Sequence, residues 1–128
     1  MDTGALGKIY HDGDIIIRQG DIGDCMYVIQ EGEVEIIVEQ GDREVQLAVR
    51  GKGELFGEMA IFEKERRSAT VRAVGTVRLL TVDEKNLIRR VHEDPSLAYR
   101  MVEMMAHRIR ELSNEVARLK LKGIADSG

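Results

Sequence analysis

Glycines recur at short intervals through the first 60 residues, with short apolar runs between them. Period-2 alternation bounded by glycine-containing turns predicts antiparallel strands in a barrel or a sandwich. Gly41 and Asp42 predict a hairpin turn between a strand near 33–39 and a strand near 44–50. The alternation is clearest in two runs: Val34, Ile36 and Val38, then Val45, Leu47 and Val49. Other strand-like runs lie at residues 15–17, 26–29, 68–73 and 77–82.

The sequence changes character after Asp83. Asp83 and Glu84 predict the start of a short helix that reaches about Val91, because acidic side chains favour the positive end of a helix. Asp94 followed by Pro95 predicts an N-cap with proline at the first helical position of the next helix.

The final helix is expected to run over residues 95–121 and to stop at Gly123. We therefore expect a single domain over residues 1–122, followed by a loose tail over 123–128. Within that domain, strands should occupy about 10–82 and helices about 83–122.

Composition limits the partners that the chain can have. Its residues are 43% hydrophobic and 33% charged, as is usual for a globular protein, and its formal net charge is −4. This charge gives no general attraction for nucleic acid, so an anionic ligand would need local positive charge and aimed N–H groups. We expect no signal peptide and no membrane contact, because no apolar run approaches the roughly 20 residues that span a bilayer. Cys25 has no cysteine to pair with internally, so we expect a cytoplasmic protein.

An enzyme is not expected. His11, His92 and His107 are scattered through the sequence and lack the close spacing of a metal site. Neither a Ser-His-Asp nor a Cys-His arrangement is visible. Cys25 lies in a strand-like run and is interpreted as a small core residue. We expect no catalytic residue, no metal and no cofactor.

The stretch over residues 54–71 is the most informative part of the chain. Gly57 allows the backbone to approach a ligand closely, and a helical turn after it would aim free N–H groups at an anion. Arg67 can donate two hydrogen bonds to phosphate oxygens, and Ser68 can add a hydroxyl. Glu58 only accepts hydrogen bonds and would repel phosphate, so its best partner is a ribose 2′-hydroxyl beside the phosphate.

This stretch resembles the phosphate-binding cassette of the cyclic nucleotide-binding domain family, nearest to the bacterial catabolite activator type. The pattern appears here as Phe56-Gly57-Glu58-Met59-Ala60, a short loop, and Arg67-Ser68-Ala69-Thr70. The resemblance extends upstream through Gly20-Asp21-Ile22-Gly23-Asp24, Tyr27-Val28-Ile29 and Gly32-Glu33-Val34, and so covers nearly the whole chain.

The resemblance implies a mainly β fold, an antiparallel, jelly-roll-like β-roll followed by a long dimerisation helix. It places the cyclic phosphate on Arg67 and the ribose hydroxyl on Glu58. Arg66 departs from the family, in which proline is frequent at this position, and we expect a less rigid loop there. The ligand-binding residues that it implies are Phe56, Gly57, Glu58, Met59, Ala60, Arg67, Ser68 and Ala69.

The final helix carries a heptad repeat. Its a positions are β-branched and its d positions include leucine, a combination that favours a parallel two-stranded coiled coil. We therefore expect a homodimer through residues 95–121; the alternative is a helix that packs only on its own β-roll. The a positions are Val102, Ile109 and Val116, and the d positions are Ala98, Met105, Leu112 and Leu119.

The region over residues 105–116 resembles the dimer helix of the catabolite activator type, in which a Thr-Ser pair contacts the adenine. Leu112 and Ser113 occupy those positions here, and the threonine is lost. Arg108 is expected to approach Glu58 when the helix covers the pocket, with Ile36 and Leu47 as an apolar wall beside the base. Ser68 directly after the arginine is typical of the cAMP-binding bacterial type, with cGMP as the alternative ligand.

We therefore expect a sensor that binds cAMP and moves its last helix in response. The alternative is a dimerisation module of the same fold that has no ligand. Regulators of the catabolite activator type place a helix-turn-helix after this helix. Because the sequence ends at Gly128, we expect no nucleic-acid contact from it.

Overall fold

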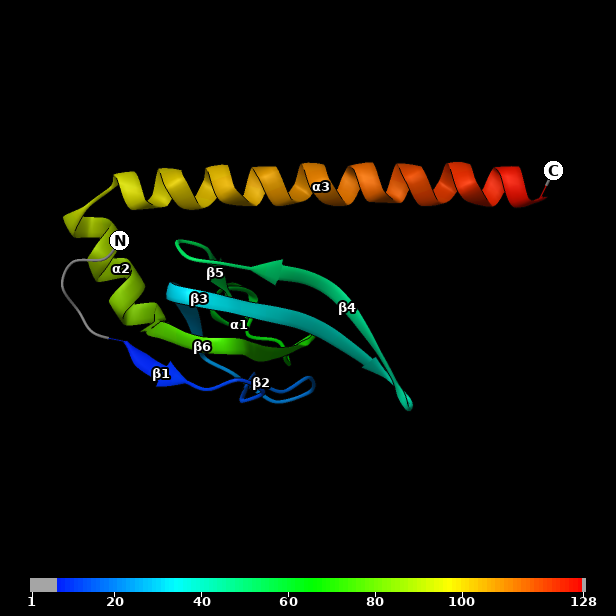
Figure 1. Cartoon of the computed structure of the whole chain (residues 1–128). Coiled ribbons are helices and arrows are strands. Elements are labelled where there is room, and N and C mark those ends of the chain that lie inside the picture. Colours follow the sequence, from blue (N-terminus) through cyan, green and yellow to red (C-terminus); the bar gives the residue numbers. More distant parts are fainter. Residues whose placement is uncertain (1–6, 128) are drawn as a thin grey trace. The chain divides into compact units, whose positions relative to one another are not determined.

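The computed structural model describes residues 7–127, with side chains through residue 124. The chain divides into two compact units: the first ends at Arg89, and the second begins at Arg90. The first unit contains all the strands, and the second contains the end of one helix and a long final helix (Figure 1). The elements are β1 (Lys8–Tyr10), β2 (Ile15–Ile17), β3 (Cys25–Gln40), β4 (Arg43–Arg50), β5 (Leu55–Phe56), α1 (Met59–Phe62), β6 (Thr70–Asp83), α2 (Glu84–Glu93) and α3 (Ser96–Ser127).

The six strands form one antiparallel sheet around the long pair β3 and β6. β1 and β2 pair with different parts of β6, and β4 and β5 pair with different parts of β3. The predicted hairpin at residues 41–42 is confirmed, since Gln40 pairs with Arg43. Together with the long helix that follows, this sheet is the mainly β architecture that the sequence predicts.

β3 and β6 are each one long strand where the sequence predicts two. Gly32 interrupts the apolar pattern of β3 with a φ of 88°, and Gly75 does the same in β6 with a φ of 69°. The β3–β6 register shifts on both sides of Glu31, yet pairing continues from Glu33 onward. These glycines bend the strands and increase their twist without ending them, as β-bulges do.

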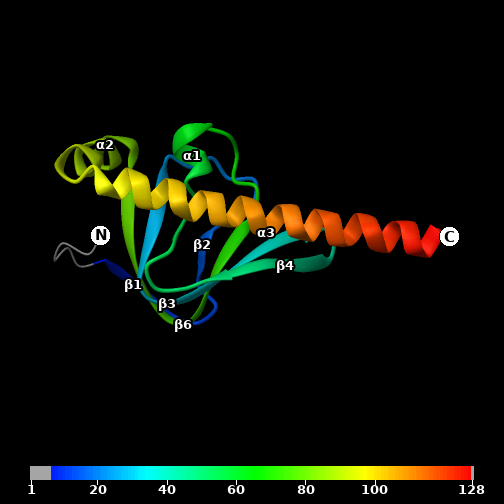
Figure 2. The ribbon, with the colours of Figure 1, turned by 90° about the horizontal axis from the view of Figure 1, so that it is seen from above.

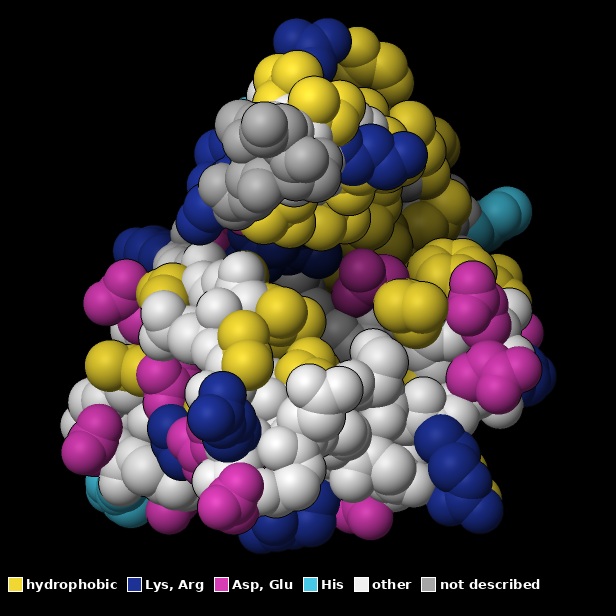
Figure 3. All heavy atoms as spheres, turned by 90° about the vertical axis from the view of Figure 1, so that its right-hand side faces the viewer, with side chains coloured by type: hydrophobic (Ala, Val, Ile, Leu, Met, Phe, Trp, Pro, Cys, Tyr) yellow, Lys and Arg dark blue, Asp and Glu magenta, His cyan; other side chains and the backbone are white. Residues whose placement is uncertain are grey.

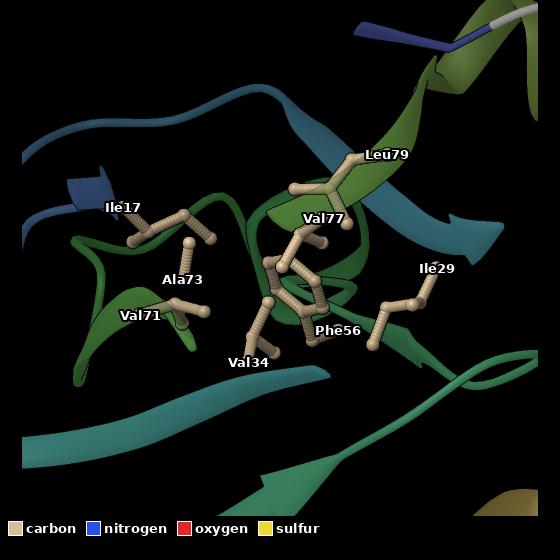
Figure 4. Packing of buried hydrophobic residues seen from close by; sticks show 8 residues of the cluster. All are labelled: Ile17, Ile29, Val34, Phe56, Val71, Ala73, Val77 and Leu79. Atoms are coloured by element: carbon tan, nitrogen blue, oxygen red, sulfur yellow. The ribbon is translucent and has the colours of Figure 1, made fainter. Parts of the chain in front are cut away.

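Phe56 lies in the centre of the hydrophobic core (Figure 4). Its side chain is 2% exposed, and its ring stacks on Tyr27 with centroids 5.2 Å apart. The cluster draws on β2, β3, β5 and β6, so it fixes the strand from which the phosphate cassette (residues 56–70) begins. Its buried members are Ile17, Ile29, Val34, Phe56, Val71, Ala73, Val77 and Leu79.

Both predicted helix starts are confirmed. The Asp83 carboxylate accepts a hydrogen bond from the Asn86 N–H at 2.8 Å at the start of α2. The Asp94 carboxylate accepts the Ser96 N–H at 3.2 Å and the Ser96 hydroxyl at 2.6 Å at the start of α3. Side-chain oxygens satisfy the N–H groups that the first helical turn leaves unpaired.

The predicted end of α3 is wrong. The helix passes through Gly123 and continues to Ser127. Gly123 does not have the positive φ of a helix-ending glycine. Within a helix, glycine costs about 1 kcal/mol relative to alanine, which is too little to end a helix alone. Among the described residues, no helix has the length and hydrophobicity needed to cross a bilayer.

Candidate functional site

Arg67 lies in the loop between α1 and β6, and its half-buried guanidinium rests on backbone carbonyls. Its Nη1 donates to the Gly57 carbonyl at 2.9 Å, and its Nη2 donates to the Cys25 carbonyl at 2.8 Å. Both partners are neutral, and within residues 7–124 no carboxylate pairs with this guanidinium. The side chain is therefore held in place with its positive charge uncompensated.

Two glycines leave the space that this guanidinium occupies. A Cβ on Gly57 would lie 2.8 Å from Arg67 Nη1, and a Cβ on Gly23 would lie 2.2 Å from Arg67 Nε. Gly57 also has a φ of 80°, which L side chains rarely adopt. Gly57 is thus required both for the turn between β5 and α1 and for the close approach of the arginine.

The backbone beside Arg67 is tied to the segment before β3. Arg67 N–H donates to the Asp21 carbonyl at 2.8 Å, and Gly20 N–H donates to the Arg67 carbonyl at 2.8 Å. Ile22 and Arg66 form an isolated antiparallel bridge, and Figure 2 shows the two segments side by side. The Arg66 side chain donates to the Gly20 carbonyl at 2.9 Å, so the loop that we expected to be loosened by this residue has an added hydrogen bond.

Glu58 is half-buried at the N-cap of α1. Its carbonyl accepts hydrogen bonds from the N–H groups of Ile61 at 3.0 Å and Phe62 at 3.2 Å. Its carboxylate does not cap the helix. The backbone of Glu58 therefore holds the short helix, while the carboxylate is not used for capping. Gly57 places this acid next to the arginine seat, which consists of the Gly57 and Cys25 carbonyls and the open space at Gly23.

The side chain of Cys25 lies beside the arginine, and Tyr27 is two residues further along β3. The Cys25 sulfur is 3.8 Å from Arg67 Nη2. Burial is the main cause that raises the pKa of the Tyr27 hydroxyl, and a hydrogen bond with the Cys25 side chain raises it further. Tyr27 therefore stays protonated at physiological pH and places no negative charge beside the guanidinium.

The remaining predicted cassette residues differ in exposure. Phe56 and Ala60 are buried, so their side chains pack in the core. Met59 and Ser68 are exposed, and Ala69 is half-buried. Thr70 is buried, and its hydroxyl accepts the Gln19 N–H at 3.0 Å, which fixes the start of β6. The cassette thus has a packed inner side and an accessible outer side.

The predicted base pocket draws on both units. Ile36 on β3 is half-buried and packs against the core cluster. Leu47 on β4 is 60% exposed and lies where the β3–β4 register shifts, so a bulge redirects its side chain. Arg108, Leu112 and Ser113 lie on α3 in the second unit, and their place beside the base stays a prediction.

A separate hollow of the first unit does not suit an anion. It is open and is lined by Asp24, Asp83, Glu84, Lys85 and Ile88. Three carboxylates against one ammonium would repel a phosphate. No group of three or more His, Cys, Asp or Glu side chains in residues 7–124 is arranged to hold a metal ion.

Sequence reasoning missed the partners of Arg67. The Cys25 contribution comes from a backbone carbonyl, which any residue at that position would supply. Gly23 acts through the absence of a side chain, and it was noticed only as part of a glycine pattern. The spacing of Gly20 and Gly23 before β3 was the one available signal.

Comparison with known proteins points to the part of the chain that contains the sheet and the cassette. The model of the cyclic nucleotide-binding domain matches residues 8–94. The cyclic AMP receptor protein of Thermus thermophilus is 33% identical over 110 residues, which cover 85% of this chain and 51% of that protein. This chain thus spans about half the length of that relative.

Solved structures agree with the fold. The catabolite activator protein of Thermus thermophilus has a TM-score of 0.77 at 32% identity, covering 88% of this chain and 54% of that one. The EAL enzyme Bd1971 in its cAMP-bound form has a TM-score of 0.63 at 34% identity, covering 86% of this chain and 30% of that one. Its cGMP-bound form has a TM-score of 0.62 at 36% identity, with coverages of 81% and 28%.

The family match includes β1 through β6 and the whole phosphate cassette, and the sheet and the arginine seat lie within it. The chain therefore belongs to the cyclic nucleotide-binding domain family.

Proposed function

We propose that this chain is a sensor that binds a cyclic nucleotide, with cAMP preferred to cGMP. One observation carries the proposal: the half-buried Arg67 guanidinium is held by two neutral carbonyls and has no carboxylate partner within residues 7–124. A partly buried charge without a counter-ion is costly, so the site favours an anion. A cyclic phosphodiester supplies one negative charge and acceptor oxygens for the remaining N–H donors.

The carboxylate of Glu58 supports a nucleotide over a simple anion. Inorganic phosphate would meet repulsion from this acid, whereas a ribose 2′-hydroxyl can donate a hydrogen bond to it. The two residues are joined through Gly57, whose carbonyl holds Arg67. The pair selects a ligand that carries a phosphodiester and a sugar hydroxyl together.

The preference for cAMP rests on Ser68 and on the names of relatives. Ser68 is exposed directly after the arginine, where a ligand base can reach it. The Thermus relative is named a cyclic AMP receptor protein, and Bd1971 has been solved with either nucleotide. Both nucleotides therefore belong in the test, and we expect the tighter binding with cAMP.

The output of the sensor is assigned to α3, with residues 1–122 acting as one domain. Apolar heptad residues are exposed along this helix, among them Val102, Ile109 and Leu112. Figure 3 views the helix from its C-terminal end and shows hydrophobic side chains on its surface. A long helix with an exposed apolar stripe is marginal in water by itself, so the stripe favours a homodimer. Ligand-dependent movement of α3 would then transmit the signal.

Calorimetric titration with cAMP and with cGMP tests the binding. We expect Arg67→Ala to weaken cAMP binding about 100-fold, equivalent to ~3 kcal/mol, because two or more charge-assisted hydrogen bonds are lost. Glu58→Gln should weaken binding less, since an amide oxygen can still accept a hydrogen bond. Arg43→Ala, on the β4 hairpin, removes the same charge and should bind as wild type does.

Two results would overturn the proposal. The first is no heat from either nucleotide with folded wild-type protein at high concentration, which would leave a dimerisation module without a ligand. The second concerns the switch alone: identical hydrogen exchange along residues 95–121 with and without cAMP would remove ligand-driven movement of α3.

A further inference from the structure

Arg66 closes a small ring of hydrogen bonds beside the arginine seat. Both polar backbone groups of Gly20 are bound by neighbouring residues of the cassette. The Gly20 N–H donates to the Arg67 carbonyl at 2.8 Å, and the Gly20 carbonyl accepts from Arg66 Nη1 at 2.9 Å. With the Arg67 N–H on the Asp21 carbonyl, three hydrogen bonds join the cassette to the segment 20–22.

The segment that Arg66 holds leads directly to the seat of the guanidinium. Beyond residue 22, Gly23 provides the open space against Arg67 Nε, and the Cys25 carbonyl accepts from Arg67 Nη2. If this segment shifts relative to the cassette, the open space at Gly23 and the Cys25 carbonyl move with it. The Arg66 side chain is exposed and makes its hydrogen bond away from the seat.

We propose that Arg66 is a positioning residue for the cyclic nucleotide: it fixes the segment 20–25 against the cassette and so holds Arg67 in its binding geometry. The proposal rests on the proposed function, because its effect is measured on nucleotide binding. Arg66 acts through Arg67 and need not touch the ligand. This role differs from attraction of the phosphate by an additional positive charge.

The variant Arg66→Pro distinguishes the positioning of Arg67 from attraction of the phosphate by an additional positive charge. The bridge between Ile22 and Arg66 is of the non-hydrogen-bonded kind, since the adjacent hydrogen bond runs from the Arg67 N–H to the Asp21 carbonyl. Proline therefore removes no ladder hydrogen bond at this position. It restricts φ and stiffens the loop, and Glu65 before it lies outside any helix. Proline thus removes the charge and the side-chain donor but keeps the loop ordered.

The experiment compares cAMP titrations of wild type, Arg66→Ala, Arg66→Pro and the charge-matched control Arg43→Ala. We expect Arg66→Ala to weaken binding about three- to tenfold, the effect of one partly exposed hydrogen bond, with the thermal midpoint of the free protein unchanged. Arg66→Pro should recover most of that loss. Arg43→Ala should match wild type at the same ionic strength.

A second background tests whether Arg66 acts through Arg67. In Arg67→Lys the ammonium cannot donate to both carbonyls in the fixed geometry of a guanidinium, so adding Arg66→Ala should cost no further affinity. Equal, additive losses in both backgrounds would overturn the proposal. So would a loss that persists in Arg66→Pro and fades with added salt, because that pattern belongs to long-range charge.

The two proposals fail in distinguishable ways. If wild type binds neither nucleotide, the proposed function fails. If wild type binds cAMP and Arg66→Ala binds it equally well, the positioning role fails and the proposed function stands.

Discussion

The two units of the chain are stabilised by opposite means. In the first unit, β3 and β6 pair residues that are up to 58 positions apart, from Cys25↔Asp83 to Ile37↔Thr70, and bury Phe56 between the strands. In the second unit, α3 makes hydrogen bonds and ion pairs between near neighbours in the sequence, such as Asp94 with Ser96, His107 with Glu111, and Glu115 with Arg118. The large apolar side chains of α3 are mostly exposed.

This difference explains why residues from distant parts of the sequence can converge on one site in the first unit. The sheet brings the Gly57 and Cys25 carbonyls to one guanidinium from 10 and 42 positions away in the sequence. A single helix joins only residues three or four positions apart, so α3 cannot form such a seat by itself. Its apolar side chains are mostly exposed in the single chain, and the proposed homodimer would bury them.

The largest expected effect breaks the core of the first unit. Phe56→Ala should lower the free energy of unfolding by about 3–5 kcal/mol, because a large buried ring leaves a cavity. Phe62→Ala is the matched control, since that ring is 63% exposed and its loss should change stability by less than about 0.5 kcal/mol. Denaturant unfolding measures both variants. Equal losses of unfolding free energy would show that Phe56 does not lie in the core.

The next effect tests the stripe of α3. Ile109→Glu places a charge at an a position, where the side chain is 63% exposed in the single chain. If two chains pair through this stripe, the change should weaken the dimer at least about tenfold, since burying an unpaired charge is unfavourable. Asn114→Glu, at an f position, should leave assembly unchanged. If sedimentation shows wild type as a monomer at all concentrations, two chains do not pair through this stripe.

The smallest effect concerns the cap of α3. Hydrogen bonds from the Ser96 hydroxyl, and further ones from Arg100 and the Ser96 N–H, lower the pKa of Asp94. A pKa that is lower in the folded state stabilises the helix start above the unfolded value near 4, and this contribution disappears as pH falls through the folded value. Asp94→Asn should reduce the acid dependence of helicity measured by circular dichroism.

Glu103→Gln provides the control for that measurement, because Glu103 is exposed on the same helix and lies outside the cap. An unchanged acid profile in Asp94→Asn would mean that the charge of Asp94 does not contribute to helix stability. A change of the same size in both variants would show a general effect of carboxylate number and not of the cap.

Local chemistry could be predicted wherever neighbouring residues supply it. The hairpin at residues 41–42 and the caps at Asp83 and Asp94 depend on residues close in the sequence, and the structure has them as predicted. Gly123 was misjudged because a glycine ends a helix only with a positive φ, which composition does not reveal. The runs on either side of Gly32 and of Gly75 were predicted as separate strands, whereas β3 and β6 bend there and continue.

Residues close together in the sequence were enough to predict the candidate binding side chains, a glycine, an acid and an arginine in one cassette, and the antiparallel strands around them. What holds the arginine in place could be learned only from the folded chain. Its partners are the carbonyls of Gly57 and Cys25 and the space left by Gly23. Every residue carries a carbonyl, so which two meet the guanidinium depends on how β3, β5 and the cassette are packed together.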